Sequence, residues 1–300
     1  MDKVLIITGP TGVGKTKLSI EIAKKFNTEI INGDAYQVYR GMDILTAKIK
    51  EEEKQDISHH LFDILDPTEE YSVATYQTNV RNLITEFTKQ NKLPLIVGGS
   101  GLYLDSVIYD YNFSSEKRNN ETEEFYKNYS NQELHDELKK LDITASEKIH
   151  MNNRKRVLRA IELAKSGNII NEFNNKLLYD VKIIYLDDDR DVLYDEINKR
   201  VDIMVSEGLI DEVTRLSKMN LSITATGAIG YKELLPYLRN EVTLEEALDE
   251  VKKNSRHLAK RQGTWFRRKD NIDFIKIDRS NFNNTINQVT NIIKEWYYEK

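Results

Sequence analysis

Residues 9–16 carry the residue types that hold a phosphate group. The segment reads GPTGVGKT, in which Gly9, Gly14, Lys15 and Thr16 fit the pattern G-x-x-x-x-G-K-[ST]. In such a loop, backbone N–H groups surround an anion at a helix N-terminus, the lysine adds a positive charge, and the hydroxyl is placed to hold Mg²⁺. We therefore expect Mg²⁺ at Thr16 and phosphate contacts along the whole loop, that is, from Gly9, Pro10, Thr11, Gly12, Val13, Gly14, Lys15 and Thr16.

Two further polar side chains follow apolar runs of strand type. Asp34 comes after the run at 29–32 (EIIN), and Ser100 comes after the run at 93–97 (LPLIV). Ligands of open parallel sheets bind at the carboxyl ends of the strands, so both residues should lie near the phosphate loop. There a carboxylate can accept a proton or order the water around Mg²⁺, and a hydroxyl can donate a hydrogen bond to a phosphate oxygen.

The elements that must position these residues alternate along the chain. Apolar runs stand at 4–8, 29–32, 93–97, 181–186 and 274–277, and helical patterns at 15–26, 73–87, 191–218 and 244–266. This alternation predicts an α/β fold, with a P-loop-type parallel sheet flanked by helices. Between 111 and 180 no run is typical of a core strand. We therefore expect a core domain of 1–111 and 179–300, and a mostly helical insertion domain of 112–178.

The composition bears on where the chain acts. Its 300 residues include no cysteine, which excludes disulfides and thiol catalysis and suits a reducing compartment. No apolar run reaches the roughly 20 residues that span a bilayer, and the N-terminus has no signal-peptide pattern. We expect a cytoplasmic protein without a membrane partner.

The net charge of −5 conceals two basic stretches. Residues 252–269 hold eight Lys or Arg and no acid, and residues 148–159 hold five and no acid. Basic stretches of this kind are typical of proteins that bind nucleic acid. Because they contain no acids, we expect their charges not to be paired within the protein.

Eight segments, in this order and over nearly the whole chain, resemble the bacterial form of the tRNA dimethylallyltransferase family. They read GPTGVGKT (9–16), NGDAYQVYRGMDILTAK (32–48), HHLFDILDPTEEYSVATYQ (59–77), LPLIVGGSGLYLDSV (93–107), NNRKRVLRAIELAKSG (152–167), RVDIMVSEGLIDEV (200–213), AIGYKEL (228–234) and RHLAKRQGTWFRR (256–268). Any one of them is a weak signal, whereas eight in sequence are specific.

The resemblance implies a reaction. The dimethylallyl group of dimethylallyl diphosphate would pass to N6 of adenosine 37 in the anticodon loop of tRNAs that read codons starting with U, with release of diphosphate. Lys15 and Mg²⁺ on Thr16 would neutralise the leaving group, and Arg200 would add a second cation. Asp34 matches the family's general base, and Ser100 matches a position, usually threonine, that contacts the bridging oxygen.

The resemblance also implies which residues hold the tRNA anticodon stem-loop. They are Asp34, Ala35, Tyr36 and Gln37 (DAYQ), Ser100, Arg118, and Lys155, Arg156, Val157, Leu158 and Arg159 (KRVLR). Lys155 and Arg159 are four residues apart and share a helix face suited to phosphate contacts, while Val157 and Leu158 point inward. Trp265 and Phe266 could stack on bases, although a place in the core suits them better. We expect the protein to act as a monomer.

This chain departs from the family pattern at Ala35, Leu45 and Ser100, where serine, glycine and threonine are usual. Other functions also stay open. A small-molecule kinase would use the same loop for ATP, an adenylate isopentenyltransferase would prenylate free AMP, and a non-catalytic protein would only bind RNA. The basic stretch at 252–269 favours a tRNA substrate over the first two, and Asp34 beside a complete phosphate loop favours an enzyme over the third.

Overall fold

The computed structural model describes residues 1–111, 113, 120–166 and 174–299. It divides into two compact units, one of Met1–Ile108 with Leu177–Lys300 and the other of Tyr109–Lys176. The bounds expected from the sequence, 1–111 with 179–300 for the core domain and 112–178 for the insertion, differ from these by two or three residues.

A six-stranded parallel sheet forms the centre of the larger unit, in the order β3-β2-β4-β1-β7-β8. The strands are β1 (Lys3–Thr8), β2 (Ile30–Asn32), β3 (His59–His60), β4 (Leu95–Val97), β7 (Asp180–Asp187) and β8 (Ile272–Lys276). The predicted α/β class is confirmed. The two-residue strand β3 escaped prediction because it is too short to show a pattern.

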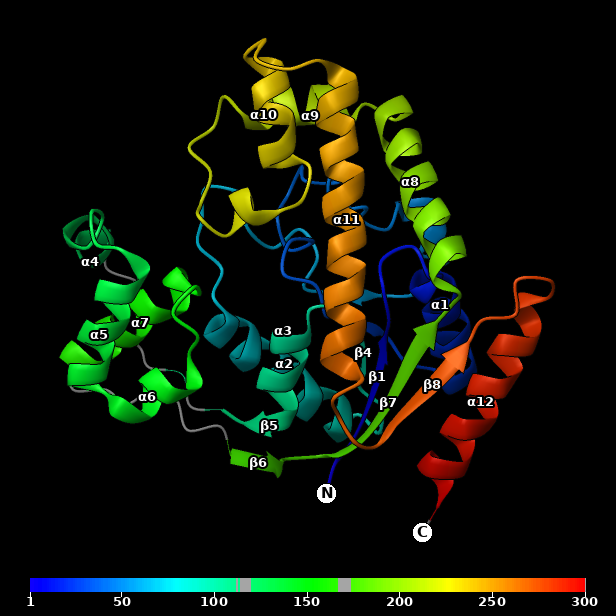
Figure 1. Cartoon of the computed structure of the whole chain (residues 1–300). Coiled ribbons are helices and arrows are strands. Elements are labelled where there is room, and N and C mark those ends of the chain that lie inside the picture. Colours follow the sequence, from blue (N-terminus) through cyan, green and yellow to red (C-terminus); the bar gives the residue numbers. More distant parts are fainter. Residues whose placement is uncertain (112, 114–119, 167–173, 300) are drawn as a thin grey trace. The chain divides into compact units, whose positions relative to one another are not determined.

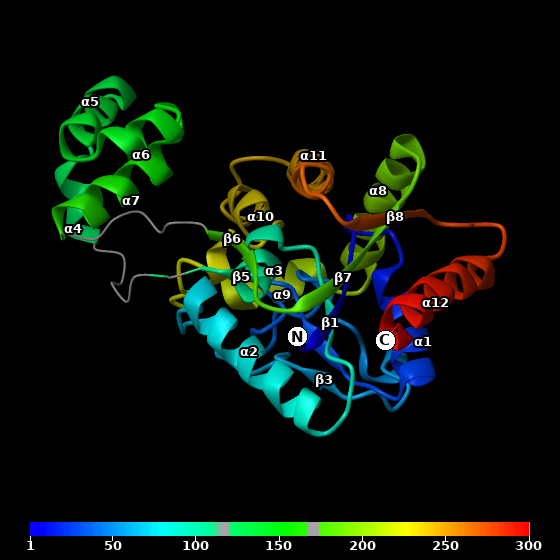
Figure 2. The same cartoon turned by 90° about the horizontal axis from the view of Figure 1, so that it is seen from below.

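Helices cover both faces of this sheet (Figures 1 and 2). On one face lie α1 (Lys15–Phe26) and α12 (Phe282–Tyr298), which contact each other, and on the other lie α2 (Val73–Lys89), α3 (Gly101–Ile108) and the long α11 (Leu244–Phe266). Every residue of β1 from Val4 to Thr8 is fully buried, as expected for a central strand between two helical layers. The remaining short elements of the unit are two 3-10 turns, Glu51–Glu53 and Ala225–Gly227, and α10 (Tyr231–Leu238).

The single helix predicted at 191–218 is wrong. The segment forms two helices, α8 (Arg190–Ser206) and α9 (Leu209–Leu216), separated at Gly208. Gly208 has φ of 104°, a left-handed conformation that ends a helix and that glycine adopts without steric cost. The break directs Glu212 of α9 toward residues 43–45, which lie before β3 in the chain and border the site.

The smaller unit is mostly helical. It contains α4 (Asn120–Phe125), α5 (Asn131–Leu141), α6 (Ile143–Lys148) and α7 (Arg154–Lys165), together with the paired strands β5 (Tyr109–Asp110) and β6 (Asn174–Leu177). Its own core includes Leu134, Leu138, Val157 and Ile161. A separate core explains how this segment folds as an insertion without adding strands to the main sheet.

Candidate functional site

The phosphate loop connects β1 to α1 and is shaped by its glycines. Gly12 and Gly14 have φ of 81° and 98°, which glycine alone adopts readily. Gly9 lies so close to β7 that a Cβ on it would be 2.6 Å from a backbone carbonyl oxygen of that strand. The loop then places Lys15 and Thr16 in the first turn of α1.

The Lys15 side chain turns back over the loop. Its Nζ donates hydrogen bonds to the carbonyl oxygens of Gly9, at 3.0 Å, and Pro10, at 2.8 Å. Burial, and after it the positive charge of Arg200, lower the pKa of Lys15 to about 7, while the charge of Asp34 opposes this shift. An ammonium group in such surroundings gains from a bound anion, because a nearby negative charge favours its protonated form.

Asp34 is held in place by Asn32, the last residue of β2. The buried Asn32 accepts the Asp34 N–H at 2.8 Å and donates from Nδ2 to the Asp34 carbonyl at 3.1 Å. The Asp34 carboxylate accepts the Tyr36 N–H at 2.8 Å. Burial raises the pKa of Asp34, while its hydrogen bonds and the charges of Lys15 and Arg200 act in the opposite direction. Sequence reasoning missed Asn32, whose position at the end of an apolar run was the available signal.

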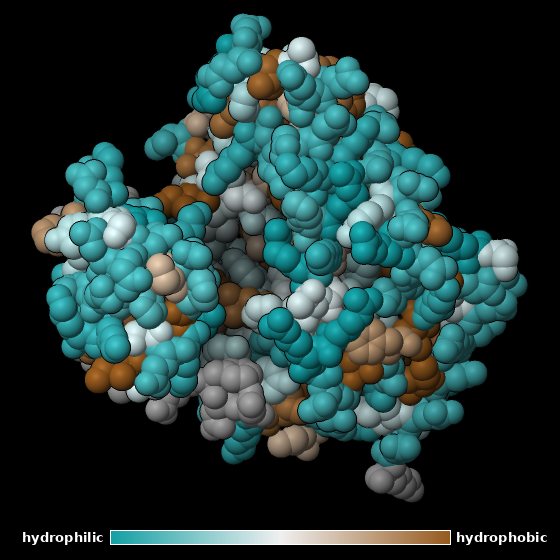
Figure 3. Space-filling view, in the orientation of Figure 1, coloured by the Kyte–Doolittle hydropathy of each residue, from teal (hydrophilic) through white to brown (hydrophobic). Residues whose placement is uncertain are grey.

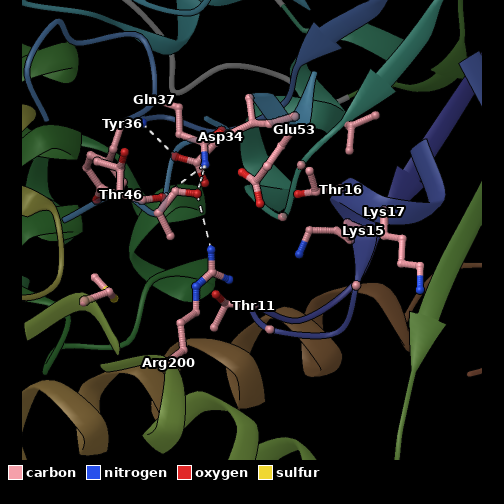
Figure 4. Close-up of a pocket in the computed structure, with 18 of the residues that line it drawn as sticks. Thr11, Lys15, Thr16, Lys17, Asp34, Tyr36, Gln37, Thr46, Glu53 and Arg200 are labelled. Atoms are coloured by element: carbon pink, nitrogen blue, oxygen red, sulfur yellow. Dashed lines mark hydrogen bonds between the residues drawn. The ribbon is translucent and has the colours of Figure 1, made fainter. Parts of the chain in front are cut away.

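A cavity of about 890 Å³ brings these groups together. In Figure 4, Lys15 and Thr16 point into it from α1, and Arg200 extends from α8 on the opposite side, toward Asp34. Arg200 donates from Nη2 to the carbonyl of Ala47 at 3.3 Å, and burial lowers its pKa. Apolar side chains complete the wall, including Leu45, Phe62, Val97, Met204 and Ile229. The cavity thus brings Asp34 together with the cations Lys15 and Arg200 beside an apolar wall, and further charged side chains line it, among them Glu53.

Ser100 follows β4, as predicted, and caps the start of α3 with its carbonyl, which accepts the Leu104 N–H at 3.0 Å. Its own N–H donates to the carbonyl of Gly33 at 3.4 Å. Of this turn, Gly98 and Gly99 line the cavity, whereas the half-buried Ser100 lies one residue beyond them. The structure therefore brings Ser100 to the edge of the site, and its hydroxyl contact with a donor stays a prediction.

Glu212 of α9 holds the segment 43–45. Its carboxylate accepts the backbone N–H groups of Asp43 at 3.0 Å, Ile44 at 3.0 Å and Leu45 at 2.8 Å. Leu45, which replaces the family's usual glycine, is 5% exposed and packs on Gly230, where an added Cβ would lie 2.6 Å from its Cδ1. Sequence reasoning missed Glu212 because the predicted single helix hid the turn that directs it.

Lys48 organises the same loop from within. Its side chain is only 5% exposed, and its Nζ donates to the Tyr39 carbonyl at 2.7 Å and to the carboxylates of Asp43 at 2.6 Å and Asp63 at 2.5 Å. Lys48 therefore stabilises the conformation of the loop that follows the DAYQ segment.

The DAYQ segment lies beside the cavity but uses its residues differently. Tyr36 and Gln37 line the cavity, and Gln37 donates from Nε2 to the carbonyls of Thr46 at 3.1 Å and Ala47 at 3.4 Å. Ala35 is 8% exposed and packs inward. Tyr36 and Gln37 are thus the members of the segment that present side chains to the site alongside Asp34.

The predicted KRVLR segment opens α7 of the smaller unit. Val157 and Leu158 are buried in that unit's core, as expected, and Lys155 and Arg156 are exposed. Arg159 is half-buried and pairs with Glu162 at 2.7 Å. Lys155 and Arg156 are therefore the residues of the segment with side chains open to solvent. The predicted contact Arg118 lies outside the described residues.

The prediction that the basic stretches are not paired within the protein is wrong. In the 252–269 stretch, Lys252 pairs with Asp202 at 2.6 Å, Arg267 with Asp187 at 2.8 Å, and Lys269 with Asp105 at 2.8 Å. The acids come from other elements, which a count along the sequence cannot detect. The exposed side of α11 still presents a hydrophilic surface (Figure 3).

The aromatic residues of α11 divide between core and surface. Phe266 is 1% exposed and packs against Tyr185, whereas Trp265 is 40% exposed and donates from Nε1 to Asp105 at 3.0 Å. The predicted place in the core is therefore confirmed for Phe266, whereas Trp265 lies at the surface.

Neither a metal-ligand cluster nor a membrane-spanning helix is present in the described part of the chain. Among the described residues, no group of three or more His, Cys, Asp or Glu side chains is arranged to hold a metal ion. In the same part of the chain, no helix combines the length and apolarity needed to cross a membrane.

The fold and the site together define a phosphate-loop α/β protein with a helical insertion. Comparison with known proteins narrows this class. The family model described as IPP transferase matches residues 37–269. The chain is 46% identical to the tRNA dimethylallyltransferase of Anoxybacillus flavithermus, over 98% of this chain and 96% of the relative, and 49% identical to that of Bacillus subtilis, over 89% and 88%. The chain belongs to the IPP transferase family.

Solved structures agree. The full-length tRNA isopentenylpyrophosphate transferase of Bacillus halodurans superimposes with a TM-score of 0.77 at 46% identity, covering 99% of this chain and 97% of that one. A eukaryotic dimethylallyltransferase acting on tRNA gives a TM-score of 0.83 at 28% identity and covers 99% of this chain and 79% of that one. The resemblance noted from eight sequence segments is confirmed.

Proposed function

We propose that this protein transfers the dimethylallyl group of dimethylallyl diphosphate to N6 of adenosine 37 in the anticodon loop of tRNAs that read codons starting with U. One observation carries the proposal. The cavity places a carboxylate, Asp34, opposite two cations, Lys15 and Arg200, next to apolar walls. A diphosphate suits the cations, a five-carbon chain suits the apolar walls, and an amine that must lose a proton suits the carboxylate.

The reaction needs one bond to break and one to form. The C1–O bond to the diphosphate breaks, and the N6 lone pair forms the new bond to C1. Lys15 and the loop N–H groups stabilise the negative charge that develops on the diphosphate, with Arg200 on the opposite side of the cavity. The N6 proton passes to the Asp34 carboxylate, and burial helps because it raises the pKa and therefore the proton affinity of that carboxylate.

The donor set at the loop fits Mg²⁺. Thr16 offers a hydroxyl oxygen on the exposed side of the first turn of α1 and lines the cavity. Mg²⁺ prefers oxygen ligands and usually takes most of them from water and substrate phosphates, in keeping with the lack of a ligand cluster among the described residues. When bound, the ion would add positive charge to the leaving group.

The acceptor base must leave its stack to reach Asp34, as bases do in other nucleic-acid enzymes. We propose that Tyr36 and Gln37 hold this base and that Lys155 and Arg156 hold the phosphates of the anticodon stem-loop. The protein would act as a monomer in the cytoplasm, where its tRNA substrates are.

The deciding experiment incubates the protein with labelled dimethylallyl diphosphate and an unmodified tRNA that carries adenosine at position 37. Nucleoside analysis should find the label on N6 of that adenosine, and a matched tRNA with guanosine 37 should stay unlabelled. Label transferred to free AMP but not to tRNA would replace the proposal with an adenylate prenyltransferase. Binding of ATP in preference to the diphosphate donor would favour a kinase.

A further inference from the structure

Gln262 of α11 joins two turns of the site with one side chain. Its Oε1 accepts the N–H of Thr11 in the phosphate loop at 3.2 Å, and its Nε2 donates to the carbonyl of Gly99 in the turn after β4 at 3.1 Å. All three residues line the cavity. The side chain is 9% exposed, so these bonds are made where water competes little.

The fit around this amide leaves no spare room. A Cβ on Gly99 would lie 2.2 Å from Nε2 of Gln262 and 3.3 Å from the carbonyl oxygen of Gly9. Glycine at 99 therefore lets the Gln262 amide reach the backbone. The phosphate loop follows β1 and the Gly99 turn follows β4, and these two strands are neighbours in the sheet. Gln262 therefore connects the loops of two adjacent strands.

We propose that Gln262 is a positioning residue that fixes the phosphate loop relative to the turn carrying Ser100, and thereby sets the geometry in which the diphosphate of the donor is bound. This inference rests on the proposed function for the identity of the donor. It adds a role for α11 within the donor site, beside the RNA contacts that its basic residues suggest.

The chemistry of an amide makes the inference testable. A glutamine presents one acceptor and one donor, whereas an ionised glutamate presents two acceptors. In Gln262→Glu the carboxylate can still accept the Thr11 N–H, but its second oxygen meets the Gly99 carbonyl and repels it. Protonation supplies the missing donor. Burial raises the pKa of a carboxyl group above its ordinary value of about 4.3, so protonation begins in a mildly acidic range.

The test measures the dissociation constant of inorganic diphosphate by calorimetry for the wild type, Gln262→Glu and Gln77→Glu. Gln77 is a matched control, because it is also 9% exposed and donates to a backbone carbonyl, that of Ser106 at 2.7 Å, away from the cavity lining. Each variant is compared with the wild type at the same pH, because Lys15, Asp34 and Arg200 face this cavity and all three have shifted pKa values of their own.

We expect Gln262→Glu to weaken diphosphate binding on the order of tenfold at pH 8, the scale of an unmatched buried acceptor, and the deficit to shrink severalfold at pH 5.5. Gln77→Glu should bind diphosphate as the wild type does at both pH values. An equal deficit at both pH values, or no deficit, would overturn the inference, and so would a matching deficit in Gln77→Glu.

A second variant covers the case in which Gln262→Glu does not fold. Gln262→Leu removes both hydrogen bonds without adding charge, and it should weaken diphosphate binding at both pH values with no recovery in acid. Wild-type affinity in Gln262→Leu would overturn the inference. Transfer of the dimethylallyl group to tRNA by the wild type is measured in a separate assay. If no transfer is found, the proposed function is refuted, but the diphosphate-binding data still decide the role of Gln262.

Discussion

Gly98 packs directly against the backbone of Gly33: a Cβ on Gly98 would lie 2.1 Å from the Gly33 carbonyl carbon. The contact places the turn after β2, with Asp34, against the turn after β4, with Ser100. Pairing of β2 with β4 brings the turns to the same edge of the sheet, and the missing side chains let them touch. Asp34, the proposed general base, and Ser100, the predicted contact to the bridging oxygen, thus owe their proximity to two glycines.

We expect Gly98→Ala to destabilise the protein by about 2 kcal/mol or more, because the methyl group overpacks a backbone contact that cannot yield. Chemical denaturation measures this loss. Gly263→Ala is the matched control, since its added Cβ meets its nearest atom at 3.4 Å inside α11 and should be neutral or slightly stabilising. Equal stability of the two variants would contradict the contact.

Asp34→Asn should slow transfer strongly while leaving the fold and donor binding intact. The amide can still accept the Tyr36 N–H through its oxygen, but it cannot take the N6 proton, and loss of a general base costs about 10²–10⁴ in rate. Single-turnover transfer to tRNA measures the effect, with diphosphate affinity as the control for folding. A rate within about threefold of the wild type would remove Asp34 from the proton transfer.

Much of this arrangement could be predicted from the sequence because it is local. The phosphate loop, the strand before it and the positions of Asp34 and Ser100 follow from short patterns, and helix 244–266 was predicted with the bounds that α11 has. The residues that hold these loops in place escaped prediction because they are distant from the loops in sequence. Gln262 reaches Thr11 across 251 residues, and Glu212 reaches Leu45 across 167.

Charge was the property least accessible to sequence reasoning. The 252–269 stretch contains no acid, yet Lys252 pairs with Asp202 on α8 because the two helices contact each other. A count along the chain measures local composition, whereas ion pairs depend on which elements the fold brings together. The number of lysines and arginines therefore overestimated the charge that α11 has available for RNA.

The pH dependence of kcat/KM for the donor should show a decline above about pH 7. In the proposed reaction the charged form of Lys15 binds the diphosphate, and its pKa of about 7 means that this charge is lost as the pH rises through that value. On the acid side the rate should fall as Asp34, whose pKa is raised by burial, becomes protonated. Initial rates at low donor concentration across a pH series test both limbs.

Lys15→Arg separates the two limbs. A guanidinium stays charged throughout the range, so the alkaline decline should move upward in pH while the acid limb stays in place. If the guanidinium group fits the phosphate loop poorly, the variant will bind the donor less well. This lowers kcat/KM at every pH but does not change the shape of its pH dependence. An unchanged alkaline limb in Lys15→Arg would assign the decline to another group.

Glu212→Ala should destabilise the protein by about 2 kcal/mol or more, because three backbone N–H groups lose a charged acceptor in a buried setting. Thermal unfolding gives the loss, and limited proteolysis should show faster cleavage near residues 43–45. Glu241→Ala is a fitting comparison, since that exposed glutamate pairs with Arg239 on the surface and should cost less than about 1 kcal/mol. If Glu212→Ala is as stable as Glu241→Ala, Glu212 does not stabilise the segment 43–45.

The salt dependence of tRNA binding should identify which part of α7 contacts phosphate. Lys155 and Arg156 are exposed, whereas Arg159 already pairs with Glu162 at 2.7 Å. Each phosphate contact contributes about 0.7–0.9 to the slope of log affinity against log salt. Replacing Lys155 and Arg156 together by alanine should therefore flatten the slope by about 1.5, and Arg159→Ala should change it by less than a single contact.

Filter binding across a salt series measures these slopes, and diphosphate affinity should stay unchanged in all variants because the donor site lies in the other unit. Lys139→Ala, an exposed lysine on α5 of the same unit, is the matched control and should leave the slope as it is. If the Lys155 and Arg156 double variant keeps the wild-type slope, α7 does not hold the RNA. A slope reduced mainly by Arg159→Ala would instead mean that RNA displaces Glu162 from its ion pair.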